Sequence, residues 1–224
     1  MTVPVPSEST NDSRPEVWTI IVAGGGGSRF GGPKQFVDLV GLSILERSVE
    51  PALSVSDGVV VVVPAGLEGE AAAIEGTVVV AGGESRSASV RAGLAAVPAS
   101  SAVILIHDAA RPLASTELFR RIVDAVLSGS AAVVPGVAVT DTIRRRTGGT
   151  VDRDAIVAVQ TPQGFSADAI RNGHASGEQA TDDATLVEQT GMAVTVIEGE
   201  PQNIKITTPQ DLSIASGWIE GMRE

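Results

Sequence analysis

Short apolar runs along the chain alternate with longer segments whose apolar residues recur every three or four positions. The runs lie at 17–23, 58–64, 77–81, 102–107 and 131–139. Four of them show no alternation of apolar and polar residues, which is typical of parallel strands covered on both faces. The segments with helical spacing lie at 43–53, 85–97 and 115–129. This order predicts an α/β fold in which helices flank a mostly parallel, twisted sheet and the crossovers are right-handed.

Residues 140–160 interrupt this order. Short β-prone pieces flank the turn sequence "TGGT", and no helical pattern separates them. Such a segment is typical of a hairpin. We expect it to project from the main sheet as a β-arm.

The last third of the chain returns to regular elements. Its patterns predict helices near 166–174 and 181–190, strands near 193–198 and at the "NIKI" segment 203–206, and a final helix from about residue 209. The final helix has a specific start, because Thr208 can cap it, Pro209 suits its first position and Asp211 completes a capping box.

Length and composition narrow the possible classes of protein. The 224 residues suit a single domain over 17–224, preceded by a leader at 1–16 whose Pro, Ser, Thr and charged residues predict disorder. A net charge of −11 disfavours nucleic-acid binding. No run approaches the roughly 18 apolar residues of a membrane span. The chain has no cysteine and no signal-peptide pattern, so we expect a cytoplasmic protein without disulfides.

A glycine-rich loop, "AGGGGSRFGGPKQF" at 23–36, follows the first predicted strand. Ligands of open parallel sheets bind beyond the carboxyl ends of the strands, and glycines there let backbone N–H groups approach an anion. Arg29 and Lys34 favour a polyphosphate. The loop closes with Gly-Pro-Lys-Gln, which does not match a P-loop, and no acidic residue follows the second strand as a dinucleotide fingerprint requires. The alternative is a flexible turn with two solvated cations.

Two further motifs follow neighbouring strands. The sequence "AGGESRSASV" spans 81–90 and "IHDAARP" spans 106–112. Small residues at these strand ends leave room for a base, and Asp108 can hold a divalent cation on the phosphates. Asp108 could instead cap a turn or a helix. His107 could simply bond to the backbone, and we assign it no catalytic role.

Six motifs in unbroken order, from about residue 18 to 220, resemble the 2-C-methyl-D-erythritol 4-phosphate cytidylyltransferase family. They are the two loops above, "HDAARP", "VDRDAIVAVQTPQGF", "TDDATLVE" and "NIKITTPQDL". The resemblance implies a Rossmann-like nucleotidyltransferase fold and a homodimer formed through the β-arm. It also implies transfer of CMP from CTP to 2-C-methyl-D-erythritol 4-phosphate, with Mg²⁺, in non-mevalonate isoprenoid biosynthesis. The products would be 4-diphosphocytidyl-2-C-methyl-D-erythritol and pyrophosphate.

The resemblance also assigns roles to single residues. Those matching the family's catalytic cations are Arg29, Lys34 and Lys205. Those matching its CTP-binding positions are Ala23, Gly24, Gly25, Gly83, Glu84 and Ser89. Those matching its acceptor-binding positions are Asp108, Arg111, Thr142, Arg153 and Thr181. Asp108 is also the expected metal ligand, and Thr142 and Arg153 are expected to grip the substrate phosphate across the dimer interface.

The glycine loop departs from the family pattern at its start. Val22-Ala23-Gly24-Gly25 stands where the family usually has Pro-Ala-Ala-Gly. Similar starts occur in ribitol-5-phosphate cytidylyltransferases, so ribitol phosphate or another polyol phosphate is an alternative acceptor. The motifs "HDAARP", "VDR" and "TDDATLVE" fit the methylerythritol enzymes better. A non-catalytic nucleotide-binding protein is a more distant alternative, and the retained charged residues argue against it.

Overall fold

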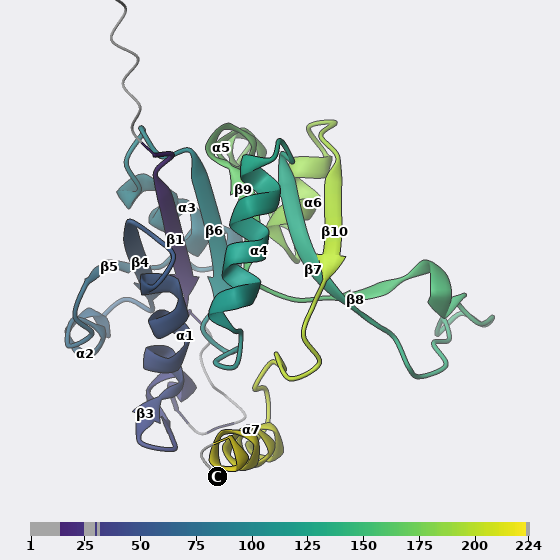
Figure 1. The fold of residues 1–224 in the computed structure, drawn as a ribbon, viewed down its shortest axis with the longest axis horizontal. Helices are drawn as coiled ribbons and strands as arrows, with labels where there is room; N and C mark the ends of the chain where they lie inside the picture. Colours follow the sequence, from purple (N-terminus) through teal and green to yellow (C-terminus); the bar gives the residue numbers. More distant parts are fainter. Residues whose placement is uncertain (1–13, 25–29, 31, 223–224) are drawn as a thin grey trace, which may run out of the picture.

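A mostly parallel sheet forms the centre of the computed structural model, which describes residues 14–24, 30 and 32–222 (Figure 1). Eight strands are paired in the order β10-β7-β9-β6-β1-β4-β5, with β8 added beside β7. Their bounds are β1 Val17–Val22, β4 Gly58–Val63, β5 Thr77–Ala81, β6 Val103–Asp108, β7 Ala132–Ala138, β8 Val157–Val159, β9 Gln163–Ser166 and β10 Val194–Glu198. Only the pairings made by β8 and β9 are antiparallel in this sheet. The predicted α/β fold is confirmed.

Helices cover both faces of this sheet (Figure 1). α1 (Ile44–Leu53) and α4 (Thr116–Leu127) pack on one face. α3 (Arg86–Ala96), α5 (Ala167–Ala175) and α6 (Asp183–Glu188) pack on the other. Successive strand side chains point to opposite faces, so Ile20 joins the second cluster and Ile21 the first. The continuous apolar runs in the sequence follow from this two-sided burial.

β9 has no counterpart among the predicted strands, although it lies between β6 and β7. Its sequence "QGFS" is too short and polar to form an apolar run. Gly164 explains how it fits, because a Cβ there would lie 2.3 Å from Ile122 of α4. The strand is therefore specified by close packing against a helix, a signal that periodicity does not carry.

A third apolar cluster lies outside the sheet. The C-terminal helix α7 (Pro209–Gly221) packs near a small hairpin of β2 (Asp38–Leu39) and β3 (Leu42–Ser43). Ile206 is fully buried in this cluster, just before the helix. Thr208 caps α7 and forms the predicted capping box with Asp211. This packing fixes the chain that follows residue 205. Two shorter elements, η1 (Lys34–Phe36) and α2 (Glu68–Ala71), precede β2 and β5 respectively.

The segment between β7 and β8 extends away from the rest of the molecule (Figure 1). Its tip is a small hairpin, with a bridge between Arg144 and Thr150 and with Gly148 and Gly149 at positive φ. A short 3-10 helix, η2 (Arg153–Ala155), follows before β8 pairs antiparallel with β7. The predicted hairpin is present. The segment also contains the short helix η2, which the sequence pattern does not predict.

Two predicted elements differ from the structure. Residues 203–206 form no strand, because their hydrogen bonds go to loops and side chains instead of to a neighbouring strand. The helix predicted near 181–190 begins at Asp183, since Asp182 caps it. Among the described helices, none is long and apolar enough to cross a membrane.

Candidate active site

A cavity of about 300 Å³ opens at the carboxyl ends of β1, β5 and β6, where an open parallel sheet binds its ligands. Its lining residues are Val22, Gly24, Gly83, Glu84, Ser85, Arg86, Ser89, Asp108 and Lys205. Six of the residues predicted from the motifs therefore meet in one place. Ala23 lies behind them, beside a smaller cavity of about 30 Å³ that Lys34 also lines.

The first turn of α3 forms one wall of the cavity. A Cβ at Gly83 would lie 2.5 Å from that of Ala88, so glycine is required for the loop to pass this close to the helix. Ser85 caps α3 by accepting a hydrogen bond from the Ala88 N–H. The buried Ser89 hydroxyl donates to the Gly83 carbonyl at 3.3 Å. This wall is made by backbone and small side chains, which leaves the space for a ligand.

Asp108, the last residue of β6, lies between two cations. Its Oδ2 accepts from Lys205 Nζ at 2.6 Å, and its Oδ1 lies 3.3 Å from both Nε and Nη2 of Arg86. Burial alone would raise the pKa of Asp108, but Arg86 and Lys205 outweigh burial and lower it to about 2. Asp108 is thus ionised at any physiological pH. It lines the cavity, and both of its side-chain partners are cations.

Arg86 was not among the residues predicted for the site. Its side chain lines the cavity and bonds to both Asp108 and Asp183. The available signal was its place in "GGESRSASV", at the first position of a helix that follows a strand end. A cation there is unfavourable for the helix dipole, so its presence indicates anionic partners.

Lys205 reaches the site from a loop, not from the predicted strand. Gln160 holds this loop at its start, accepting from the Glu200 N–H at 3.0 Å and donating to the Glu200 carbonyl at 2.8 Å. Asn203 continues the attachment by donating to the Thr161 carbonyl at 2.9 Å. Arg111, one of the predicted acceptor-binding residues, donates to the Asn203 carbonyl at 2.7 Å. Side-chain amides and Arg111 therefore set the position of Lys205.

Lys34 and Lys205 are the two lysines of the chain. Lys34 lies in η1, and its Nζ donates to the Ile206 carbonyl at 2.6 Å, next to Lys205 in the sequence. Lys34 is therefore hydrogen-bonded to the same short segment that carries Lys205. Gly25 and Arg29, predicted for the nucleotide and the transition state, lie outside the described residues.

His107 is fully buried behind Asp108. Its Nε2 is 3.2 Å from the Arg111 carbonyl, so Nε2 carries the hydrogen, and Nδ1 accepts from Thr161 Oγ1 at 3.1 Å. Thr161 Oγ1 in turn accepts the Asp108 N–H at 3.0 Å. These bonds fix the strand end, in agreement with the structural role expected from the sequence.

The burial of His107 predicts a pH-dependent stability. Burial lowers the pKa of His107 from 6.5 to about 4. Between pH 6.5 and pH 4, His107 is therefore protonated in the unfolded chain and neutral in the folded chain. The free energy of unfolding should therefore fall as the pH falls from 6.5 to 4, by about 3 kcal/mol from this group. His107→Gln should flatten this part of the profile in urea unfolding measured at a series of pH values. An unchanged difference in stability between pH 6.5 and 4 in the variant would contradict this account.

Of the five predicted acceptor-binding residues, only Asp108 lines the cavity. Arg111 supports the Lys205 loop instead, and the other three lie elsewhere. Thr142 and Arg153 lie on the projecting segment, where both are exposed and Arg153 donates to the Thr140 carbonyl at 2.6 Å. Thr181 is exposed before α6. The described part of this chain therefore does not bring these three residues to Asp108.

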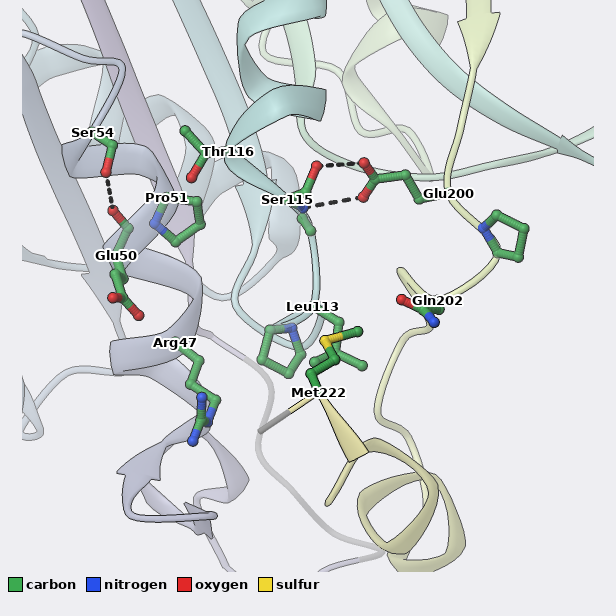
Figure 2. Close-up of a pocket in the computed structure, with 13 residues that line it drawn as sticks. Arg47, Glu50, Pro51, Ser54, Leu113, Ser115, Thr116, Glu200, Gln202 and Met222 are labelled. Atoms are coloured by element: carbon green, nitrogen blue, oxygen red, sulfur yellow. Dashed lines mark hydrogen bonds between the residues drawn. The ribbon is translucent and has the colours of Figure 1, made fainter. Parts of the chain in front are cut away.

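A larger cavity, of about 720 Å³, lies elsewhere, between α1, the start of α4, residues 200–202 and the end of α7 (Figure 2). It contains none of the residues predicted from the motifs. Figure 2 shows the Glu200 carboxylate accepting from the backbone N–H and the hydroxyl of Ser115. This contact joins the Lys205 loop to the start of α4. Residues 200–202 of that loop form one wall of the larger cavity.

A family model described as IspD, 2-C-methyl-D-erythritol 4-phosphate cytidylyltransferase, matches residues 17–220. This chain belongs to the IspD family. The match includes every strand of the central sheet and all residues that line the 300 Å³ cavity. The IspD resemblance inferred from the six motifs is therefore confirmed.

Curated relatives agree with this IspD assignment. The 2-C-methyl-D-erythritol 4-phosphate cytidylyltransferase of Rhodococcus jostii (strain RHA1) is 44% identical over 221 residues, covering 93% of this chain and 97% of the relative. The bifunctional enzyme IspD/IspF of Nitratidesulfovibrio vulgaris (strain DP4) is 42% identical over 223 residues. That alignment covers 88% of this chain and 56% of the relative, so the chain spans about half of the bifunctional protein.

Solved IspD structures share the fold. The 2-C-methyl-D-erythritol 4-phosphate cytidylyltransferase from Thermus thermophilus has a TM-score of 0.78 and 36% identity, covering 92% of this chain and 99% of that one. The 4-diphosphocytidyl-2C-methyl-D-erythritol synthase from Anaerococcus prevotii has a TM-score of 0.81 and 28% identity, with the same coverage. The predicted Rossmann-like nucleotidyltransferase fold is confirmed.

Proposed function

We propose that this chain transfers CMP from CTP to 2-C-methyl-D-erythritol 4-phosphate in isoprenoid precursor biosynthesis. The observation that carries the proposal is the 300 Å³ cavity, where Asp108 lies between Lys205 and Arg86 at the carboxyl ends of the strands, in a member of the IspD family. A phosphate oxygen of the acceptor attacks the α-phosphorus of CTP. The bond from that phosphorus to the bridging oxygen breaks, and pyrophosphate leaves.

The protein contributes charge and alignment to this reaction, as in phosphoryl transfer generally. We assign Lys34, Lys205 and Arg29 to the negative charge of the triphosphate and of the transition state. We assign the cytosine and ribose to Gly24, Gly83, Glu84 and Ser89 of the cavity lining. The same assignment includes Ala23 and Gly25, of which Gly25 lies outside the described residues. A wall built this closely on α3 favours a pyrimidine over the larger purine.

A divalent cation, Mg²⁺, fits the donors of this site as a partner of the nucleotide. Among the described residues, no three His, Asp or Glu side chains are grouped as a metal site. Mg²⁺ is commonly held by one or two carboxylates together with substrate phosphates, and the ionised Asp108 supplies one. The cation would neutralise phosphate charge. We propose Asp108 as its protein ligand.

We further propose a homodimer in which the projecting segment of one subunit completes the acceptor site of the other. Two observations support it: Thr142 and Arg153 do not line the cavity of their own chain, and the segment carries exposed apolar side chains. Ile143, Val157 and Val159 are each more than a third exposed. Such side chains on a projecting strand favour a protein partner. Thr181 is assigned to the acceptor hydroxyls.

Pyrophosphate release by the purified protein tests the reaction. CTP, Mg²⁺ and 2-C-methyl-D-erythritol 4-phosphate should release pyrophosphate, and omitting the acceptor should abolish the release. Ribitol 5-phosphate and ATP serve as the alternative acceptor and donor. Turnover with ribitol 5-phosphate but not with methylerythritol phosphate would refute the proposed acceptor.

Arg153→Ala should raise the KM for the acceptor more than the KM for CTP, because Arg153 is assigned only to the acceptor phosphate. Steady-state kinetics with each substrate varied in turn measures both constants. Arg146→Ala, in the exposed tip of the same segment, is the matched control and should change neither. Equal increases in both KM values for Arg153→Ala would argue against the assigned role.

A further inference from the structure

Asp183 is a fully buried carboxylate outside the residues assigned above. It lies at the start of α6, but it is not needed to cap that helix, because Asp182 already accepts from the Thr185 N–H at 3.0 Å. Its two oxygens have separate partners. Oδ2 accepts from Arg86 Nη1 at 2.7 Å, and Oδ1 lies 3.0 Å from Nε2 of the buried His174 of α5. Burying a carboxylate costs free energy unless it is paired and hydrogen-bonded, so these two partners account for its burial.

His174 serves Asp183 alone among the described residues. Its Nε2 carries the hydrogen that Asp183 accepts, and its Nδ1 is buried with no hydrogen-bond partner. Burying an imidazole with one unpaired nitrogen costs free energy. The hydrogen bond to Asp183 is the interaction that accounts for a histidine at this position. The imidazole fixes the orientation of the Asp183 carboxylate.

Because Arg86 also bonds to Asp183, its guanidinium contacts Asp108 in an unusual geometry. A guanidinium beside a carboxylate commonly forms two parallel bonds, one to each oxygen. Here Nε and Nη2 both address Oδ1, each at 3.3 Å, while the shorter contact of 2.7 Å goes to Asp183. Oδ2 of Asp108 is thereby left to Lys205.

We propose that Asp183, oriented by His174, is a positioning residue that holds Arg86 away from a two-oxygen grip on Asp108. This keeps Oδ2 of Asp108 available to Lys205 and to the divalent cation that accompanies CTP, and it rests on the function proposed above. Without Asp183, the guanidinium swings fully onto Asp108, occupies both oxygens and displaces Lys205.

Asp183→Asn tests this inference, because its single acceptor oxygen can serve Arg86 or His174 but not both. Calorimetric titration of CTP, without acceptor, at a series of Mg²⁺ concentrations gives the Mg²⁺ concentration that half-saturates CTP binding. This concentration should rise about tenfold, the lower end of the usual effect of disturbing the hydrogen bonds of a metal ligand. His174→Leu should act in the same direction, and His174→Gln, which keeps a donor, should be milder.

The double variant Asp183→Asn, Arg86→Lys separates positioning from structure. Lysine offers a compact ammonium that cannot grip both oxygens of Asp108. The double variant should therefore require less Mg²⁺ than Asp183→Asn alone. An equal or greater requirement would overturn the inference, as would an unchanged requirement in Asp183→Asn.

Arg171→Leu is the matched control on α5, the helix that carries His174. Arg171 donates to the carbonyls of Leu94, Val97 and Pro98, away from the cavity. Its loss should lower the thermal midpoint and leave the Mg²⁺ requirement unchanged. A shift as large as that of Asp183→Asn would trace the effect to α5 stability and overturn the inference. Wild-type protein that binds no CTP would instead refute the proposed function.

Discussion

Lys34→Ala is expected to lower kcat about a hundredfold or more, corresponding to a loss of ~3 kcal/mol of transition-state stabilisation. Lys34 lies beside Ala23 at the end of β1, where the triphosphate is placed in the proposed reaction. Negative charge is spread over the phosphate oxygens as the new bond forms, and a cation already in position stabilises it without reorganisation.

The same substitution also removes the hydrogen bond from Lys34 to the Ile206 carbonyl. Lys34→Arg is the appropriate control, since it keeps the charge and a donor, and it should retain part of the activity. Steady-state kinetics together with the thermal midpoint separate chemistry from folding. A folded Lys34→Ala protein with unchanged kcat would show that the glycine loop is not a triphosphate site.

Lys205→Ala is expected to cause a loss of kcat of similar size, about a hundredfold. The variant removes the cation closest to Asp108, with Nζ at 2.6 Å from Oδ2. Arg86 remains, so Asp108 keeps one counter-charge and the fold should be preserved. Unchanged kcat in a folded variant would remove Lys205 from the proposed mechanism.

Lys205→Ala has a second readout in acid. The folded-state pKa of Asp108, about 2, lies below its ordinary value of 3.8, so its stabilising contribution is present above pH 3.8 and is lost as the pH falls towards 2. Removing Lys205 raises the folded-state pKa and shrinks that contribution. Unfolding at a series of pH values should therefore show a shallower acid loss in the variant. A profile parallel to that of the wild-type protein would contradict the pairing of Lys205 with Asp108.

The sheet could be predicted from the sequence because its strands are buried on both faces, which leaves continuous apolar runs such as 58–64. The start of α7 could be predicted because Thr208 and Asp211 form a local motif. β9 could not, since the need for Gly164 arises from α4, which is distant in the sequence. Local signals therefore fix elements, whereas strand insertion depends on contacts that sequence spacing does not record.

The candidate site divides in the same way. Asp108 could be predicted because it follows a strand, and the carboxyl ends of parallel strands meet at one edge of the sheet. Lys205 was found by resemblance but placed on a strand, and its actual support comes from Gln160 and Asn203. The sequence motifs assign no role to Asp183, whereas the structure pairs it with Arg86. Such pairs join residues that are far apart in the chain, so no spacing pattern indicates them.

The attachment of both lysines to the segment around Ile206 has a practical consequence for chemical labelling. Lys34 and Lys205 are the chain's only side-chain amines, and the Lys205 side chain is 45% exposed. Among the side chains, reagents that acylate amines therefore modify this one location, and bound nucleotide should shield it. Coupling the protein to a surface through lysine would block its own cavity, whereas attachment through carboxylates distant from the cavity would leave it open.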